Sequence, residues 1–159
     1  MLELEATLLI SLWVFEYWEI STRKVARDRA VFFPWWVFPI VWFILKFLMV
    51  LSTYFYWRDN SANLDVALVS LYFANGVLRK YWSVAFVDYN QSVLALVLAF
   101  FIAGTSIALV TLYGIQGLWL PFGLAFPLAI WCTIAVGMNW VDIKRQKKKT
   151  TDKSQQFWL

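Results

Sequence analysis

Histidine is absent from the 159-residue sequence, and cysteine occurs only once, at Cys132. Without histidine the chain cannot form a serine–histidine–aspartate triad, a histidine-ligated haem or a histidine-containing zinc site. A single thiol also excludes a disulfide bond within the chain. Charged residues make up only 15% of the sequence, whereas an ordinary soluble domain has about 25%. We therefore expect no metal centre, and we expect a class of protein other than a soluble domain.

Apolar and aromatic residues dominate what is present. Hydrophobic residues make up 62% of the sequence and aromatic residues 20%, including 11 tryptophans. A transmembrane helix needs roughly 20 predominantly apolar residues. Runs close to this length or longer predict helices over residues 6–22, 31–57, 64–89, 91–115 and 118–141. The sequence therefore predicts an all-α, multi-pass integral membrane protein, with residues 1–143 forming one compact five-helix bundle.

The basic residues are concentrated at one end of this predicted bundle. The first predicted loop has four and residues 144–159 have six, whereas the opposite end has only Arg58. The positive-inside rule then places the N-terminus outside and the C-terminus inside. The polar composition of residues 144–159 predicts a disordered basic tail. Its lysines are expected to contact anionic lipid at the inner face of the membrane.

Aromatic and polar residues share one face on each of three predicted helices, because they recur at helical spacing. These residues are Trp35, Trp42 and Lys46 in 31–57, Asn75, Arg79 and Trp82 in 64–89, and Trp131, Ala135 and Asn139 in 118–141. Such faces can line an internal pocket for a flat apolar ligand. The alternative is that they pack helices together and form the aromatic belts in which tryptophan is enriched.

Several charged residues fall within the predicted spans and need partners there. They are Glu16, Glu19, Lys46, Arg79 and Lys80. A basic residue at the centre of a span costs about 2.5–3.5 kcal/mol on insertion scales. One hypothesis is internal ion pairing, and another is recognition of an anionic lipid such as cardiolipin or of porphyrin propionates. The third is snorkelling to the headgroups, or pairing with acids of a neighbouring subunit.

Residues 34–42, followed by Leu48 and Met49, resemble the second helix of the translocator protein family, also called tryptophan-rich sensory proteins. Trp82 and Ser83, with Phe86, have the spacing of the third helix of that family. The last helix is similar too, and its matching residues are Pro127, Trp131, Ala135, Gly137, Met138 and Asn139. The resemblance covers about residues 34–140 and implies a five-helix membrane bundle with an internal pocket.

The resemblance also implies a function. Members of the family bind porphyrins such as haem and protoporphyrin, sterols, and synthetic benzodiazepine-site ligands, and they often dimerise. We therefore expect a membrane protein that binds a porphyrin, a sterol or an anionic lipid and requires no cofactor. A porphyrin would be held by ring stacking and propionate pairing, because histidine is absent. A mitochondrial membrane is favoured, with a bacterial or other organellar membrane as the alternative.

The sequence departs from the family pattern in several places. The first loop lacks the Trp-Tyr and Lys-Pro motifs of the family, and Lys46, Arg79 and Leu128 replace an aromatic residue, an asparagine and a tyrosine. These departures support an alternative function, that of a non-catalytic structural subunit in a larger membrane complex such as a mitochondrial respiratory assembly. Neither function is enzymatic, because no Glu, Lys or Tyr is positioned for acid–base work. Nucleic-acid binding is not expected.

Overall fold

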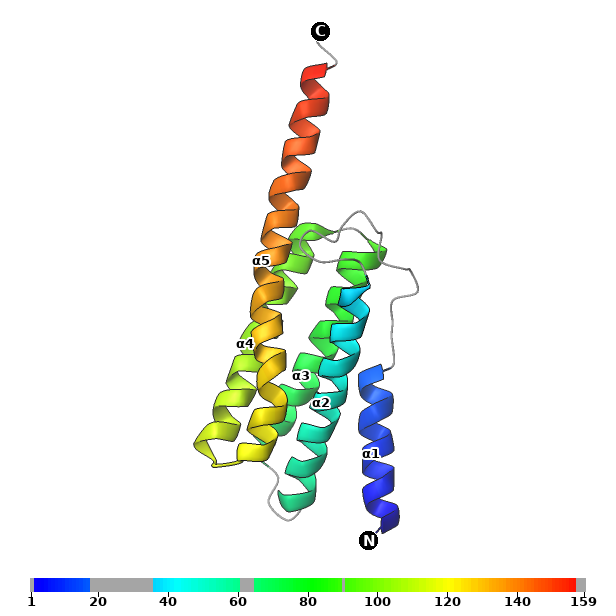
Figure 1. Cartoon of the computed structure of the whole chain (residues 1–159), viewed down its shortest axis with the longest axis vertical. Helices are drawn as coiled ribbons and strands as arrows, with labels where there is room; N and C mark the ends of the chain where they lie inside the picture. Colours follow the sequence, from blue (N-terminus) through cyan, green and yellow to red (C-terminus); the bar gives the residue numbers. More distant parts are fainter. Residues whose placement is uncertain (1, 18–35, 61–64, 90, 157–159) are drawn as a thin grey trace.

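The structure is a computed structural model that describes residues 2–17, 36–60, 65–89 and 91–156. Within these residues the chain forms five α-helices, which run alternately up and down the long axis of the molecule (Figure 1). The helices are α1 Leu2–Tyr17, α2 Val37–Asn60, α3 Val66–Ser83, α4 Ser92–Ile115 and α5 Trp119–Gln156. The described residues contain no β-strand, which confirms the predicted all-α class.

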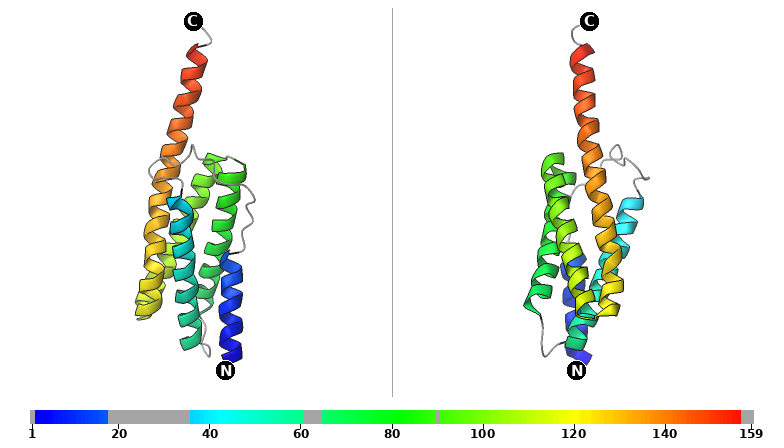
Figure 2. Two further views of the ribbon diagram at one scale, coloured as in Figure 1. Left: turned by 45° about the vertical axis from the view of Figure 1, so that its right-hand side comes forward. Right: turned by 90° about the vertical axis from the view of Figure 1, so that its left-hand side faces the viewer.

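The helices pack side by side around a shared core. α2 contacts both α1 and α5, and α4 lies between α5 and α3. α3 also reaches α1, because the ring of Phe15 packs against the rings of Tyr72 and Phe73. The order around the bundle is therefore α1, α2, α5, α4 and α3, and Figure 2 shows this arrangement from two further sides.

Each predicted helix overlaps one observed helix, and the largest difference is at the end of the last one. We expected that helix to end at residue 141 and a disordered tail to begin at 144, and this is wrong because α5 continues to Gln156. Extending an existing helix requires no new nucleus, and the lysines and glutamines of this segment favour helices. The predicted helical residues 18–22 and 31–35 lie outside the described residues.

The third predicted helix ends in a widened turn. The α-helical part stops at Ser83 and continues as the π-helical turn η2, Val84–Asp88. The backbone N–H of Tyr89 donates to the carbonyl of Val84 over 3.1 Å, one residue further apart than in an α-helix. This turn keeps Phe86 in the core and leads into the short connection to α4.

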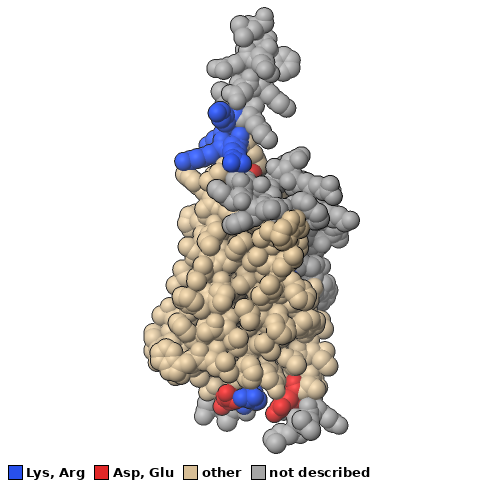
Figure 3. Space-filling view, in the orientation of Figure 1, with Lys and Arg blue, Asp and Glu red and all other residues tan. Residues whose placement is uncertain are grey.

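Three of the described helices are long and apolar enough to cross a membrane. They are α2, α4 and the Trp119–Lys148 part of α5. On the face seen in Figure 3, charged side chains lie at the two ends of the molecule and the surface between them is uncharged. Large apolar side chains such as Phe100, Phe101 and Ile107 are exposed between those ends. Apolar surface of this extent marks contact with lipid or protein.

Candidate functional site

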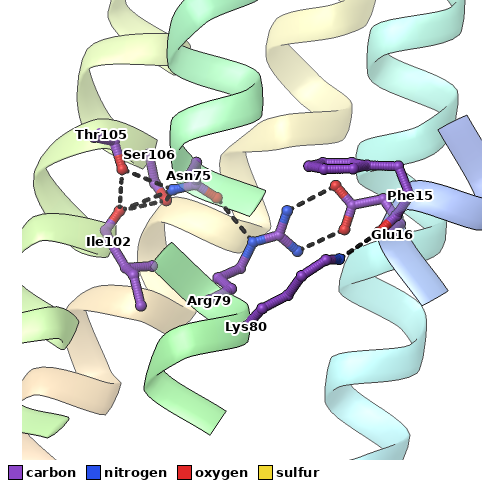
Figure 4. Close-up of polar contacts among 8 residues, drawn as sticks. All are labelled: Phe15, Glu16, Asn75, Arg79, Lys80, Ile102, Thr105 and Ser106. Carbon is purple, nitrogen blue, oxygen red and sulfur yellow. Dashed lines mark hydrogen bonds and ion pairs between the residues drawn. The ribbon is translucent and has the colours of Figure 1, made fainter. Parts of the chain in front are cut away.

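A buried ion pair joins α1 to α3 in the interior of the bundle. The two terminal nitrogens of Arg79 donate to the two carboxylate oxygens of Glu16 over 2.7 and 2.8 Å (Figure 4). The residues are only 6% and 2% exposed. This forked geometry matches guanidinium to carboxylate with two parallel hydrogen bonds, which makes the contact both strong and directional.

The ion pair continues into α4 through an asparagine. Nε of Arg79 donates to Oδ1 of Asn75 over 2.9 Å. Nδ2 of Asn75 lies 2.8 Å from Oγ of Ser106 and 2.9 Å from Oγ1 of Thr105. It also lies 3.1 Å from the carbonyl oxygen of Ile102. Asn75 is fully buried, so this network ties α1, α3 and α4 together away from water.

The network lies deep within the span. Ile102 is near the centre of α4, roughly 15 Å along the helix axis from Ser92 at about 1.5 Å per residue. α4 is one of the three helices that can cross a membrane. Polar groups at this depth have no water with which to bond, so their partners must come from the protein.

Lys46 and Lys80, the other two basic residues that fall within the predicted spans, contact the last turn of α1. Nζ of Lys80 donates to the carbonyl oxygen of Phe15 and lies 4.5 Å from the centre of the Phe15 ring. Nζ of Lys46 lies 5.6 Å from the centre of the Tyr17 ring, and the Tyr17 hydroxyl donates to the carbonyl of Phe43 over 2.9 Å. Both lysines therefore face α1, from α3 and α2 respectively.

Aromatic rings from α2, α3 with its η2 turn, and α5 form a second group, which we call the aromatic cluster. It consists of Phe38, Trp42, Trp82, Phe86 and Trp131. The Trp42 and Trp82 ring centres are 5.8 Å apart, and Trp82 stacks on Phe86 at 5.1 Å with a 9° angle between the rings. Phe38 meets Trp131 edge to face at 5.7 Å. The cluster packs flat aromatic rings together between three helices.

Polar atoms in and near the cluster lack partners. Among the described residues, no hydrogen-bond acceptor contacts the buried Nε1 atoms of Trp42 and Trp82. The side chain of Asn139 donates to the carbonyl of Ala135 over 2.7 Å, whereas its buried Oδ1 has no donor among those residues. Most buried polar groups in proteins are hydrogen-bonded, so each exception needs an explanation.

The structure therefore divides the predicted site residues into two groups. Asn75 and Arg79 join Glu16 in the polar network, whereas Trp42 and Trp82 lie together in the aromatic cluster. Trp131 belongs to the same cluster through its contact with Phe38, and Ala135 and Asn139 are buried further along α5. Glu19 and Trp35 lie outside the described residues.

Sequence reasoning missed the residues that complete each group. Thr105 and Ser106 bind Asn75, and their adjacent hydroxyls within an otherwise apolar predicted helix were a signal for a polar partner. Phe38 joins the aromatic cluster, and it lies one helical turn before Trp42 on the face that the spacing had already singled out.

A helical bundle with three membrane-length apolar helices and an interior aromatic cluster defines an integral membrane protein. The sequence profile of the TspO/MBR family matches residues 8–143. The chain therefore belongs to the TspO/MBR family and is a translocator-protein-like membrane protein. The match ends before the part of α5 that extends to Gln156. No curated protein matches the sequence.

Proposed function

We propose that the protein binds a planar, oxygen-bearing hydrophobic ligand at the aromatic cluster, with a porphyrin as the foremost class. The observation that carries the proposal is that the neighbouring rings of Trp42 and Trp82 each have a buried indole N–H without an acceptor among the described residues. A ligand with carboxylate or carbonyl oxygens would give both donors an acceptor, and its flat ring would stack on the indoles. A sterol offers only a hydroxyl and no flat aromatic face, so it fits this pair of donors less well.

The polar network limits how such a ligand is held. Arg79 was a candidate for pairing with propionates, yet three of its N–H groups already bind Glu16 and Asn75. The buried guanidinium is therefore better explained as a structural group than as a ligand contact. A porphyrin would be held without histidine ligation, by stacking and by the indole donors.

Titration of the purified protein with protoporphyrin tests this proposal. Saturable quenching of tryptophan fluorescence is expected at micromolar concentration. Trp42→Phe and Trp82→Phe keep a ring but remove the donor, and each is expected to weaken binding about three- to tenfold, the range for one hydrogen bond. Trp119→Phe is the matched control, because Trp119 is 70% exposed at the far end of the bundle. Absence of saturable quenching, or equal weakening by the control, would refute the proposal.

We further propose that all five helices cross the membrane in the translocator-protein arrangement, with the N-terminus outside and the C-terminus inside. The interior position of the Glu16–Arg79 pair supports five crossings, because it lets α1 and α3 lie beside the three apolar spans, and the basic residues at one end support the orientation. A mitochondrial membrane remains our favoured location. Cysteine-accessibility mapping tests the topology, since single cysteines at the two ends should be labelled from opposite sides.

A second candidate function is that of an accessory subunit in a larger membrane complex. The extension of α5 favours it, because this helix continues beyond the rest of the bundle and beyond the family match (Figure 1). Extraction in mild detergent followed by size separation distinguishes the two functions. Migration only with a large complex, without protoporphyrin binding, would support the subunit function.

A further inference from the structure

A group of cations lies on α5 directly after its apolar part. Lys144, Arg145, Lys147 and Lys148 are all exposed, and we call them the basic arc. At 3.6 residues per turn they fall within an arc of about 160°, on the side of α5 opposite Gln146. Figure 3 shows these blue side chains gathered beside the uncharged band, at the end where α5 leaves the bundle.

The opposite side of α5 is fixed against the bundle at this level. Nε2 of Gln146 donates to Oγ of Ser92 over 2.8 Å and to Oδ2 of Asp142 over 2.9 Å. Oγ of Ser92 in turn donates to Asp142 over 3.0 Å. The carboxylate of Asp142 is therefore buried and faces α4, away from the basic arc. The four cations consequently face outward from the bundle.

Two observations place the basic arc at the edge of the membrane. First, Ser92 is the first residue of α4, so Gln146 lies level with the end of a spanning helix. Second, the exposed Trp119 and Trp140 on α5 are roughly 30 Å apart along the axis at about 1.5 Å per residue. That separation matches the hydrocarbon thickness of about 30 Å, and tryptophans are enriched at both of its interfaces.

The headgroup layer on each side is about 5–7 Å thick, which corresponds to about three to five helical residues. The stretch 144–148 lies roughly 6–12 Å beyond Trp140 at about 1.5 Å per residue, so it begins at the outer edge of this layer. Nζ of Lys144 lies 5.3 Å from the centre of the Trp140 ring, so this lysine folds back toward the interface. The basic arc thus lies within a Debye length, about 8 Å, of the headgroup layer, on the same outward side of α5 as Trp140.

We propose that the basic arc binds the headgroups of anionic phospholipids in the leaflet at this end of the bundle. Anionic headgroups attract juxtamembrane cations, and the outward direction and depth of the arc favour lipid over a soluble acidic partner. At the opposite end of the bundle, Arg58 pairs with Asp59 over 2.8 Å, and Glu5 and Asp65 add negative charge. The proposed lipid site is separate from the aromatic cluster and does not depend on porphyrin binding.

Native mass spectrometry of the full chain, in micelles with equal phosphatidylglycerol and phosphatidylcholine, tests the proposal. The wild type is expected to retain phosphatidylglycerol preferentially. Each neutralised cation should reduce this preference about five-fold, as expected for one basic residue at the membrane surface. Lys148→Gln should thus lose about five-fold and the double variant K144Q/K148Q about 25-fold. Protoporphyrin binding should be unchanged in both variants.

Two controls keep the test decisive. K144R/K148R preserves charge and should retain the preference, and R58Q removes a cation from the opposite end and should also retain it. Raising the salt concentration should reduce the preference of the wild type itself, so the proposal is tested even if a neutralised variant misfolds. Equal retention of both lipids by the wild type, or an equal loss in R58Q, would overturn the proposal. So would an acidic protein that co-purifies only with the wild type while lipid retention shows no preference.

Discussion

Replacing Glu16 by glutamine is expected to destabilise the bundle more than any other single change in the polar network. Glu16 is 2% exposed and accepts both hydrogen bonds of the Arg79 fork. Glutamine has nearly the same shape but no charge. The variant would therefore leave the guanidinium of Arg79 buried in the bundle with only neutral partners.

The size of the effect follows from the geometry. The N–O distances of 2.7 and 2.8 Å place the charge centres about 4 Å apart. At an effective dielectric constant of about 20, such a pair interacts by about 4 kcal/mol. Removal of one partner from a buried pair costs about 3–5 kcal/mol in measured cases. We therefore expect Glu16→Gln to lower the free energy of unfolding by about 4 kcal/mol.

Removal of the opposite partner should cost less. Arg79→Met leaves a buried carboxyl group, and carboxyl groups have a neutral form that is tolerated in an apolar interior. A guanidinium cannot be neutralised in this way, because it stays protonated in proteins. We expect Arg79→Met to lower the free energy of unfolding by about 2–3 kcal/mol. The double variant E16Q/R79M holds no buried charge at these positions and should lower it by only about 1–2 kcal/mol.

Equilibrium unfolding with sodium dodecyl sulfate, followed by far-ultraviolet circular dichroism, measures these differences in detergent micelles. Glu5→Gln is the matched control on the same helix. Its half-buried carboxylate accepts from the Tyr54 hydroxyl over 3.3 Å, so the change should cost less than about 1 kcal/mol. Additive costs in the double variant would refute the reasoning, as would a cost for Glu16→Gln no larger than that of the control.

Two further predictions concern the packing of the helices, the first measured by the same unfolding assay and the second by thiol labelling. A Cβ atom at Gly76 would lie 2.7 Å from Cζ of Phe15, so Gly76→Val should push α1 away and cost about 1–3 kcal/mol. Gly104→Ala is its control: nothing lies within 4 Å of the added atom, and stability should stay the same or rise by up to about 1 kcal/mol. The thiol of Cys132 is 1% exposed, so maleimide labelling should be at least about 100-fold slower in the folded protein, because it requires a local opening of about 3 kcal/mol. Fast labelling of the folded protein would show that α5 is not packed as described.

The sequence was sufficient to predict the helices and their buried faces, because both follow from periodicity along one segment. Asn75, Arg79 and Trp82 recur at helical spacing, and all three are buried on α3. Periodicity does not give the relative heights of neighbouring helices. The pairing of Arg79 with Glu16 depends on how far α1 is shifted along α3. In the same way, the contact of Lys46 with Tyr17 depends on how far α1 is shifted along α2. For the same reason, Asn75 was grouped with pocket residues although its amide binds α4.

The end of α5 was mispredicted for a different physical reason. Hydropathy marks where the apolar part of a helix stops, which is near the boundary of the membrane. It does not mark where backbone hydrogen bonding stops, because a helix that is already formed extends at little cost through lysine and glutamine. The α5 segment after residue 143 is polar and still helical to Gln156. The contact of Gln146 with Ser92 sets the start of this segment level with the first residue of α4.

The polar network also joins the two helices of the bundle that are the least suited to cross a membrane alone. α2, α4 and α5 are apolar enough to cross a membrane, whereas α1 has 16 residues and α3 carries Arg79 and Lys80. These two weaker helices are the ones that the Glu16–Arg79 pair and the Lys80–Phe15 contact join. Glu16 on α1 neutralises the charge of Arg79, which would otherwise keep α3 out of lipid. In the five-span arrangement that we propose, insertion of α3 therefore depends on α1. Loss of Glu16 should affect insertion of α3 as well as the stability of the folded bundle.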